Sequence, residues 1–280
     1  MKFQDITFVI VMYRSEKVIH ECLRELPKDL RKIIVDNSGN EKLKKSIEEQ
    51  YDNCECYLMD ENLGYGGANN FGINKAKTDY VFIINPDTNI NEEKYKKIVS
   101  YLNGQDFAIA APQIIETDKI YKQNNSERKI IEVEQVPGMA MIINKNKFNK
   151  NYFDENIFMY LEEIDLCKRM RDLGERILEI NIVINHLGGQ SHGDYDLEME
   201  KSRNWHWMWS KFYFNKKHHN YFYSFFKTFP NLLSSFFKVI LFSLIRNKTK
   251  STQYKMRVLG LINSYLLNKS FYRPYKNKFF

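Results

Sequence analysis

DYVFIINPDT, residues 79–88, is the stretch of sequence that decides the fold. Its Tyr80–Ile84 portion is continuously aromatic or aliphatic, which predicts a short strand buried on both faces of a sheet. Pro86 cannot donate to a sheet ladder, so the strand ends just before Asp87. The carboxyl ends of strands are where open α/β sheets bind ligands. Asp87 is therefore either a ligand-binding carboxylate or a cap for a helix that begins near Asn91.

Strands alternate with helices on both sides of this stretch. Apolar runs predict further strands at residues 6–13, 32–38, 107–112, 136–144 and 176–189. Helices are expected between them, because charged amphipathic segments separate most of these runs. This alternation predicts a mostly parallel α/β sheet flanked by helices.

Residues 61–76 (ENLGYGGANNFGINKA) form a Gly- and Asn-rich stretch that we expect to be a loop leading into a helix. Glycines allow close approach of the backbone to a ligand, and a helix N-terminus attracts anions. The G-x-G-G spacing is not the dinucleotide fingerprint, and a purely structural turn is the competing interpretation. Together with Asp36 and Asp87 at strand ends, the stretch favours a nucleotide diphosphate held with a cation.

Two later features carry polar chemistry. Glu162, Glu163 and Asp165 fall at the start of an amphipathic helix, and three acids there exceed what the helix dipole needs. His186 ends a predicted strand, and a lone histidine of this kind is more often structural than a metal ligand.

The charge distribution separates the chain into an acidic body and a basic tail. Of 42 Lys and Arg residues, 16 lie in the last 80 positions, which contain no Asp or Glu. We expect a catalytic domain at residues 1–215 and a helical extension at residues 216–280.

The extension is apolar and aromatic as well as basic. Its longest apolar stretch, residues 229–245, falls short of a convincing membrane span because polar residues interrupt it. A helix from Asn231 would carry a narrow polar stripe and a broad apolar face, which favours an in-plane helix on an anionic membrane surface. Packing into a homo-oligomer is the alternative. Nucleic-acid binding is disfavoured, because no reader motif accompanies the charge.

The four cysteines show no CxxC pair, which favours reduced thiols and a cytoplasmic chain. The N-terminus runs directly into a strand and lacks a small-residue cleavage site, so no secretory signal is expected.

Seven motifs in order carry a family resemblance. They are VIVMYRSE, VDNSGN, ENLGYGGANNFGI, INPDT, PGMAMIINKNKF, FDENIFMYLEEIDLCKRMRDLG and INHLGG. Over roughly residues 5–215 the chain resembles the inverting family 2 glycosyltransferases of the GT-A type, especially their rhamnosyltransferase-like branch. The resemblance implies a Rossmann-like, nucleotide-sugar-binding fold.

The resemblance also implies a donor site built from strand ends and the glycine stretch. Its residues would be Tyr13, Glu16 and Asp36 around the nucleobase and ribose, and Gly64, Gly67 and Asn69 along the diphosphate and ribose. Asn85-Pro86-Asp87 matches the D-x-D metal motif with its first aspartate replaced. Asp87 would bind Mg²⁺ or Mn²⁺, with His186 as the second protein ligand.

Glu162-Glu163 matches the family's Glu-Asp pair. The chemistry needs a carboxylate that accepts the proton of the acceptor hydroxyl, and we expect Glu163 to be this base. The longer side chain of Glu, compared with Asp, leaves Glu162 as the alternative.

The sequence thus predicts a metal-dependent, inverting transferase acting from a nucleotide-sugar donor. The resemblance favours dTDP-rhamnose, with UDP-hexoses open. The acceptor would be a lipid-linked or cell-envelope glycan such as an O-antigen, and the enzyme would work in the cytoplasm on the inner face of the plasma membrane. The alternative is a catalytically inactive relative that binds nucleotide sugar or glycan as the partner of another transferase.

Overall fold

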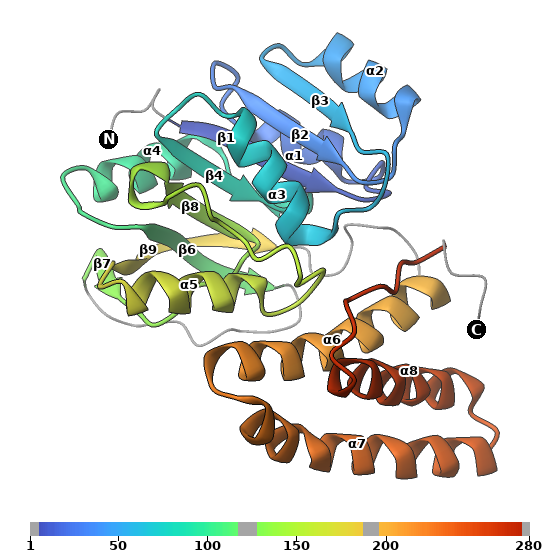
Figure 1. Ribbon diagram of the computed structural model, residues 1–280. Helices are drawn as coiled ribbons and strands as arrows, with labels where there is room; N and C mark the ends of the chain where they lie inside the picture. The colour runs from blue at the N-terminus through green and yellow to red at the C-terminus, as the bar shows by residue number, and fades with distance from the viewer. Residues whose placement is uncertain (1–5, 117–127, 187–195, 276–280) are drawn as a thin grey trace. The chain divides into compact units, whose positions relative to one another are not determined.

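The structure is a computed structural model that describes residues 6–116, 128–186 and 196–275 (Figure 1). The chain divides into two compact units. The sheet unit contains residues 1–154 and 163–194, and the helical unit contains residues 155–162 and 195–280. This division lies earlier in the chain than the expected boundary at residue 215, because residues 197–218 belong to the helical unit.

The sheet unit is built on a nine-stranded sheet within the described residues, in the order β3-β2-β1-β4-β8-β6-β9-β5, with β7 paired to β9. Its strands are β1 (Ile6–Met12), β2 (Lys32–Asp36), β3 (Cys54–Leu58), β4 (Tyr80–Ile84), β5 (Thr88–Asn89), β6 (Ile109–Glu116), β7 (Ile130–Glu132), β8 (Ala140–Asn144) and β9 (Ile177–His186). Its helices are α1 (Ile19–Glu25), α2 (Glu41–Gln50), α3 (Gly64–Lys75), α4 (Glu92–Leu102) and α5 (Glu162–Asp172), the last beginning at the boundary between the units.

The strands β3, β2, β1 and β4 are parallel, as the apolar runs of β1, β2 and β4 predict. Beyond β4 the sheet is mixed, because β8 pairs antiparallel with both β4 and β6. One core layer packs α1, α2 and α4 against the sheet, and the other packs α3 and α5 against its opposite face. The predicted class of an α/β sheet flanked by helices is confirmed, with a mixed sheet in the later half.

The helical unit contains α6 (Leu197–His218), α7 (Tyr221–Leu244) and α8 (Lys248–Tyr265). Trp205 and Trp209 of α6 pack with Met256 of α8, which is why α6 belongs to this unit. Gly260 allows the close approach of α8 to α6, since a Cβ there would lie 2.2 Å from the carbonyl oxygen of Trp205.

Helix α7 has 24 residues and begins at Tyr221, ten residues before the expected start at Asn231. Residues 229–245 were predicted to fall short of a convincing membrane span because polar residues interrupt them, and the helix that contains most of them is longer than this stretch. By length and composition, α7 is the one helix in the described part of the chain that is long and apolar enough to cross a membrane. The aromatic turns that precede Pro230 extend the apolar helix beyond residues 229–245.

Candidate functional site

Asp87 and His186 meet at the edge of the sheet, although they are distant in the sequence. After β4, the backbone N–H of Thr88 donates to the carbonyl of Asn85 (3.1 Å), which turns the chain into β5. Strand β5 then pairs antiparallel with the end of β9, with Thr88 opposite His186. As a result, Asp87 Oδ1 lies 3.1 Å from His186 Nε2, and both side chains are buried.

The alternative role of Asp87 as a helix cap is wrong. Helix α4 begins at Glu92, and its cap is Asn91, whose side chain accepts from the backbone N–H of Lys94. Asp87 lies before β5, on the other side of this cap. Its carboxylate contacts the imidazole of His186 instead.

The Asp87–His186 pair has the chemistry of an incomplete metal site. A carboxylate oxygen and an imidazole nitrogen are both ligands for divalent cations. Within the described ranges, no group of three or more His, Cys, Asp or Glu residues could hold a metal ion. Mg²⁺ characteristically uses few protein carboxylates and completes its shell with phosphates and water. The two residues therefore fit a cation that is held jointly with a diphosphate.

Residues expected around the nucleobase lie together on the loops that follow β1 and β2. The Asn40 side chain donates to Glu16 Oε1 (2.9 Å), and the backbone N–H of Arg14, next to Tyr13, points to Ser38 Oγ (3.4 Å). The Asp36 carboxylate is buried and accepts from Ser38 and from the backbone N–H of Asn40 (2.8 Å). These hydrogen bonds fix the conformation of the loop after β2. A contact between Asp36 and a nucleobase stays a prediction.

The glycine stretch differs from the expected loop, because helix α3 begins at Gly64 itself. Gly64 has a positive φ of 77°, and Gly67 is buried in the first turn. Asn69 is fully buried, and its side chain donates to the carbonyl of Tyr65 (2.9 Å). Further along α3, a Cβ at Gly72 would lie 2.5 Å from Val9 Cγ1, so close packing on β1 holds this glycine-rich segment in a helix despite its low helix propensity.

Three polar residues that the sequence analysis missed fix this helix. The Asn37 side chain donates to the carbonyl of Gly64 (3.2 Å) and accepts from the backbone N–H of Leu63 (3.3 Å). Asn70 exchanges two hydrogen bonds of 2.9 Å with the backbone of Phe153. Tyr65 donates its hydroxyl to the carbonyl of Gly138 (2.6 Å). Of these three residues, only Asn70 had a sequence signal, which was the asparagine content of residues 61–76.

Glu163 lines a cavity of about 380 Å³ in the sheet unit. Burial raises the pKa of Glu163 above its ordinary value, and the backbone N–H groups of Glu163 and Ile164 partly offset this effect. Gly138 lies against this side chain, since a Cβ there would be 3.3 Å from Glu163 Cβ. The small residue before β8 thus leaves room for the Glu163 side chain.

The neighbouring acids have different surroundings. Glu162 is buried but is not among the residues that line this cavity, and it falls in the helical unit. Asp165 is fully buried and bonds Arg169 (2.8 Å), which in turn donates to the backbone carbonyls of Asn151 and Tyr152. Asp165 therefore holds a loop in place, and Glu163 is the acid that faces open space.

Met139 connects the Asp87 turn to the cavity. Its carbonyl accepts from the backbone N–H of Asn85 (2.9 Å), and Met139 itself lines the cavity beside Glu163. The Asp87–His186 pair and the candidate base are thus joined through one short segment that precedes β8. Gly188 and Gly189 of the last sequence motif lie outside the described residues.

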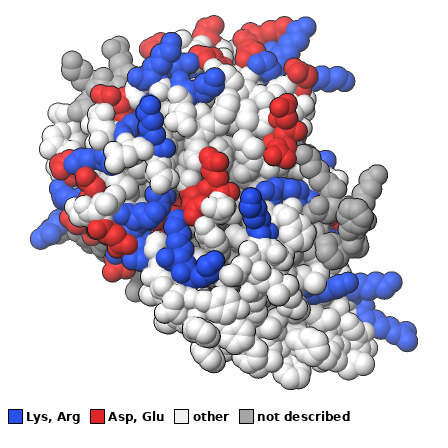
Figure 2. Space-filling view, in the orientation of Figure 1, with Lys and Arg blue, Asp and Glu red and all other residues white. Residues whose placement is uncertain are grey.

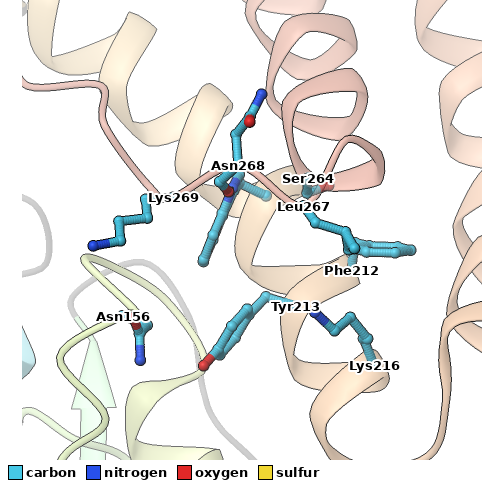
Figure 3. A pocket seen from close by; sticks show the side chains of 9 residues that line it. Asn156, Phe212, Tyr213, Lys216, Ser264, Leu267, Asn268 and Lys269 are labelled. Atoms are coloured by element: carbon cyan, nitrogen blue, oxygen red, sulfur yellow. The ribbon is translucent and has the colours of Figure 1, made fainter.

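A second, smaller cavity of about 110 Å³ lies within the helical unit. Figure 3 shows Asn156, Tyr213 and Lys269 around one part of it, with Phe212 from α6 and Leu267 after α8 nearby. Its described lining contains no carboxylate and no histidine. It lacks the groups for acid–base chemistry that the cavity around Glu163 provides.

The chain resembles known proteins in sequence and in fold. The profile of Glycosyl transferase family 2 matches residues 7–167. Low-salt glycan biosynthesis hexosyltransferase Agl10 of Haloferax volcanii is 26% identical over 191 residues, which are 60% of this chain and 62% of the relative. The chain thus spans less than two thirds of that protein.

Rhamnosyltransferase WbbL of Escherichia coli K12 is 24% identical over 235 residues, covering 71% of this chain and 88% of the relative. Among solved structures, S. aureus TarS 1-349 in complex with UDP-GlcNAc superposes with a TM-score of 0.55 at 13% identity. That match covers 96% of this chain and 93% of the TarS 1-349 chain, and it shows a shared fold.

Proposed function

Because the chain belongs to glycosyl transferase family 2, we propose that it moves a sugar from a nucleotide-diphosphate donor to a glycan acceptor, with inversion at the anomeric carbon. The observation that carries the proposal is the buried Asp87–His186 contact of 3.1 Å, joined through Met139 to the cavity that Glu163 lines. Together these groups provide a cation site for a diphosphate and a carboxylate for an incoming hydroxyl.

In the proposed reaction, ionised Glu163 accepts the proton of the acceptor hydroxyl. The resulting oxygen attacks the anomeric carbon, and the bond from that carbon to the donor diphosphate breaks. The nucleoside diphosphate leaves with the bonding electron pair. Desolvation raises the pKa of Glu163, which makes its ionised form a stronger base.

Asp87 and His186 would hold Mg²⁺ or Mn²⁺, which neutralises negative charge on the diphosphate when it is bound. Their contribution is to present one oxygen and one nitrogen at the same point of the sheet edge. The loops that carry Tyr13, Glu16 and Asp36 would bind the nucleoside, and the first turn of α3 would approach the diphosphate through its N–H groups.

The donor sugar is proposed from the relatives. WbbL is named a rhamnosyltransferase and supports dTDP-rhamnose, whereas the hexosyltransferase Agl10 and the UDP-GlcNAc complex of TarS support a UDP-hexose. A lipid-linked or cell-envelope glycan is the proposed acceptor.

A thermal-shift screen of nucleotide sugars with Mg²⁺ or Mn²⁺ tests the donor proposal. A ligand that binds only the folded chain raises its apparent stability by mass action. We expect one donor class to raise the melting temperature in a metal-dependent way and to be consumed when acceptor is present. Binding without any transfer or hydrolysis of the donor would favour the inactive, partner-type relative. Absence of metal-dependent stabilisation by every donor would contradict the proposal.

We also infer that α7 places the chain on an anionic membrane surface, at the cytoplasmic face. The buried side chains of α7 are Ser224, Thr228 and Ser235, while its exposed side chains are mainly large and apolar. Figure 2 shows a broad uncharged surface in its lower part, with basic residues at the margin. The last 80 residues contain no acidic group to repel lipid phosphates. A homo-oligomer that covers the same face is the alternative outcome.

A further inference from the structure

The cavity around Glu163 contains a second polar feature that the proposed reaction does not use. Gln113 of β6 donates through Nε2 to Glu179 Oε1 of β9 (3.2 Å), and both side chains line the cavity. On each strand these positions continue a row that is otherwise apolar. Ile109 and Ala111 precede Gln113, and Ile177 precedes Glu179, on the sheet face that α5 covers.

An irregularity in the sheet lies at this point. Strands β6 and β9 pair in regular parallel register up to Pro112 opposite Ile180, and then Gln113 pairs with Val183. Proline cannot donate to the ladder and is typical of bulges. Bulges near active sites commonly redirect a side chain. Here the shift occurs next to Gln113, one of the two residues of the polar pair.

Among the residues that the structure describes, Glu179 forms no ion pair, and Gln113 is its neutral hydrogen-bond donor. A partly buried carboxylate without a cation costs desolvation energy, unless other donors complete its hydrogen bonding. The carboxylate keeps lone pairs for further donors on the side that faces the cavity.

The remaining walls suit a sugar. Val136, Pro137, Met139 and Ile164 give apolar surfaces against which C–H groups can pack, and the volume of about 380 Å³ is ample for one ring. Sugar hydroxyls are donors as well as acceptors, so they match a carboxylate and an amide at one site.

Resting on the proposed glycosyl transfer, we infer that this cavity is the acceptor subsite, and that Gln113 and Glu179 bind hydroxyls of the acceptor sugar while Glu163 deprotonates the reacting one. The pair determines acceptor specificity, since a sugar that lacks the matched hydroxyl leaves the carboxylate without its donor. The donor side, at Asp87 and His186, is separate from this pair.

The test measures the binding of simple glycosides to the full chain in the presence of UDP and Mn²⁺. Saturation-transfer NMR detects the bound glycoside and gives its affinity. The probes are methyl glycosides of glucose, galactose, mannose, rhamnose and N-acetylglucosamine. We expect at least one probe to bind, and Glu179→Gln and Gln113→Ala to weaken its affinity about tenfold or more, because each removes a hydrogen bond to a charged or buried group. Glu132→Gln is the matched control, since Glu132 lies on neighbouring β7, pairs with Arg176 and does not line the cavity.

The thermal shift caused by UDP with Mn²⁺ separates the two proposals. If the wild-type chain shows the shift but binds no glycoside, or if Glu179→Gln and Gln113→Ala bind like wild type, the acceptor subsite is overturned and the donor proposal stands. If neither nucleotide nor donor sugar shifts the wild-type chain, the proposed function fails first. Retention of the shift in both variants shows that they are folded.

Discussion

The Asp87–His186 contact and helix α7 both depart from the rule that apolar side chains face inward and polar ones outward, but in opposite directions. The sheet unit buries a carboxylate and an imidazole at the edge of a sheet whose two core layers are apolar. The helical unit buries Ser224, Thr228 and Ser235 of α7, and Thr228 Oγ1 forms a hydrogen bond with the hydroxyl of Tyr265 (2.9 Å). Several phenylalanines of the same helix are exposed. Burying polar groups is expensive and points to chemistry, whereas exposing apolar ones points to an apolar environment.

The largest expected effect is on the sheet unit. Glu163→Gln should reduce sugar transfer roughly 10³-fold, within the range for loss of a general base. The same change should not destabilise the fold at neutral pH, because it removes a carboxylate whose burial disfavours the charged form. Single-turnover transfer and the melting temperature check both parts. Glu162→Gln is the control, and a larger loss in Glu162→Gln than in Glu163→Gln would reverse the assignment.

Asp87→Asn tests the buried polar contact itself. The substitution keeps the shape but removes the charge that a divalent cation needs, so metal-dependent transfer should fall by roughly two orders of magnitude. The thermal shift by nucleotide with Mn²⁺ should shrink at the same time. Asp165→Asn is a useful comparison, because Asp165 is equally buried but bonds Arg169. Loss of fold stability without a change in metal response is expected there. Unchanged metal response in Asp87→Asn would contradict the ligand role.

Gly260→Ala tests the packing of the helical unit. The added Cβ would meet the carbonyl of Trp205 at 2.2 Å, so α8 must move away from α6. We expect a loss of about 2 kcal/mol in the free energy of unfolding, typical of overpacking. Urea unfolding followed by tryptophan fluorescence measures it, because all three tryptophans lie in α6. Lys255→Ala, at an exposed position of the same helix, is the control. Equal losses in both variants would remove the packing explanation.

Replacing four exposed phenylalanines of α7 by glutamine tests whether the exposed apolar face of this helix binds a membrane. In Phe222, Phe226, Phe236 and Phe237, more than half of the side chain is exposed. Binding to vesicles that contain anionic lipid should fall about tenfold or more, because binding scales with buried apolar area. Vesicle co-sedimentation measures it. Leu173→Gln, an exposed apolar residue of the sheet unit, is the control. Unchanged vesicle binding together with a loss of self-association would favour the oligomer.

The smallest expected effect is a shift in the pH profile. Glu163 must be ionised to act as a base, so its raised pKa moves the acidic limb of kcat to higher pH than an ordinary glutamate would give. Because the folded-state pKa lies above the unfolded one, ionisation of Glu163 costs stability, and this cost grows as pH rises through the folded pKa. The melting temperature of Glu163→Gln relative to wild type should therefore increase with pH. A decrease with pH would show that the carboxylate is stabilised in the fold.

Local sequence patterns were sufficient to predict a strand or helix whose conformation depends only on its own residues. The apolar run Tyr80–Ile84 and the following Pro86 predicted a buried strand that ends before Asp87, and β4 has these bounds. The glycine stretch was harder. Glycine favours loops by propensity, and the packing of Gly72 on Val9 that keeps α3 helical involves a strand far away in the sequence.

The sequence by itself determined the α/β class, the delivery of Asp87 to a sheet edge and the acidic start of α5, because strand and helix periodicities are local. Only the tertiary structure decided that His186 contacts Asp87, through the pairing of β5 with β9, and that Gln113 and Glu179 share a cavity with Glu163. It also decided which face of α7 is inward. Strand pairing and helix packing join residues far apart in the chain, and their free energy depends on neighbours that no single stretch of sequence specifies.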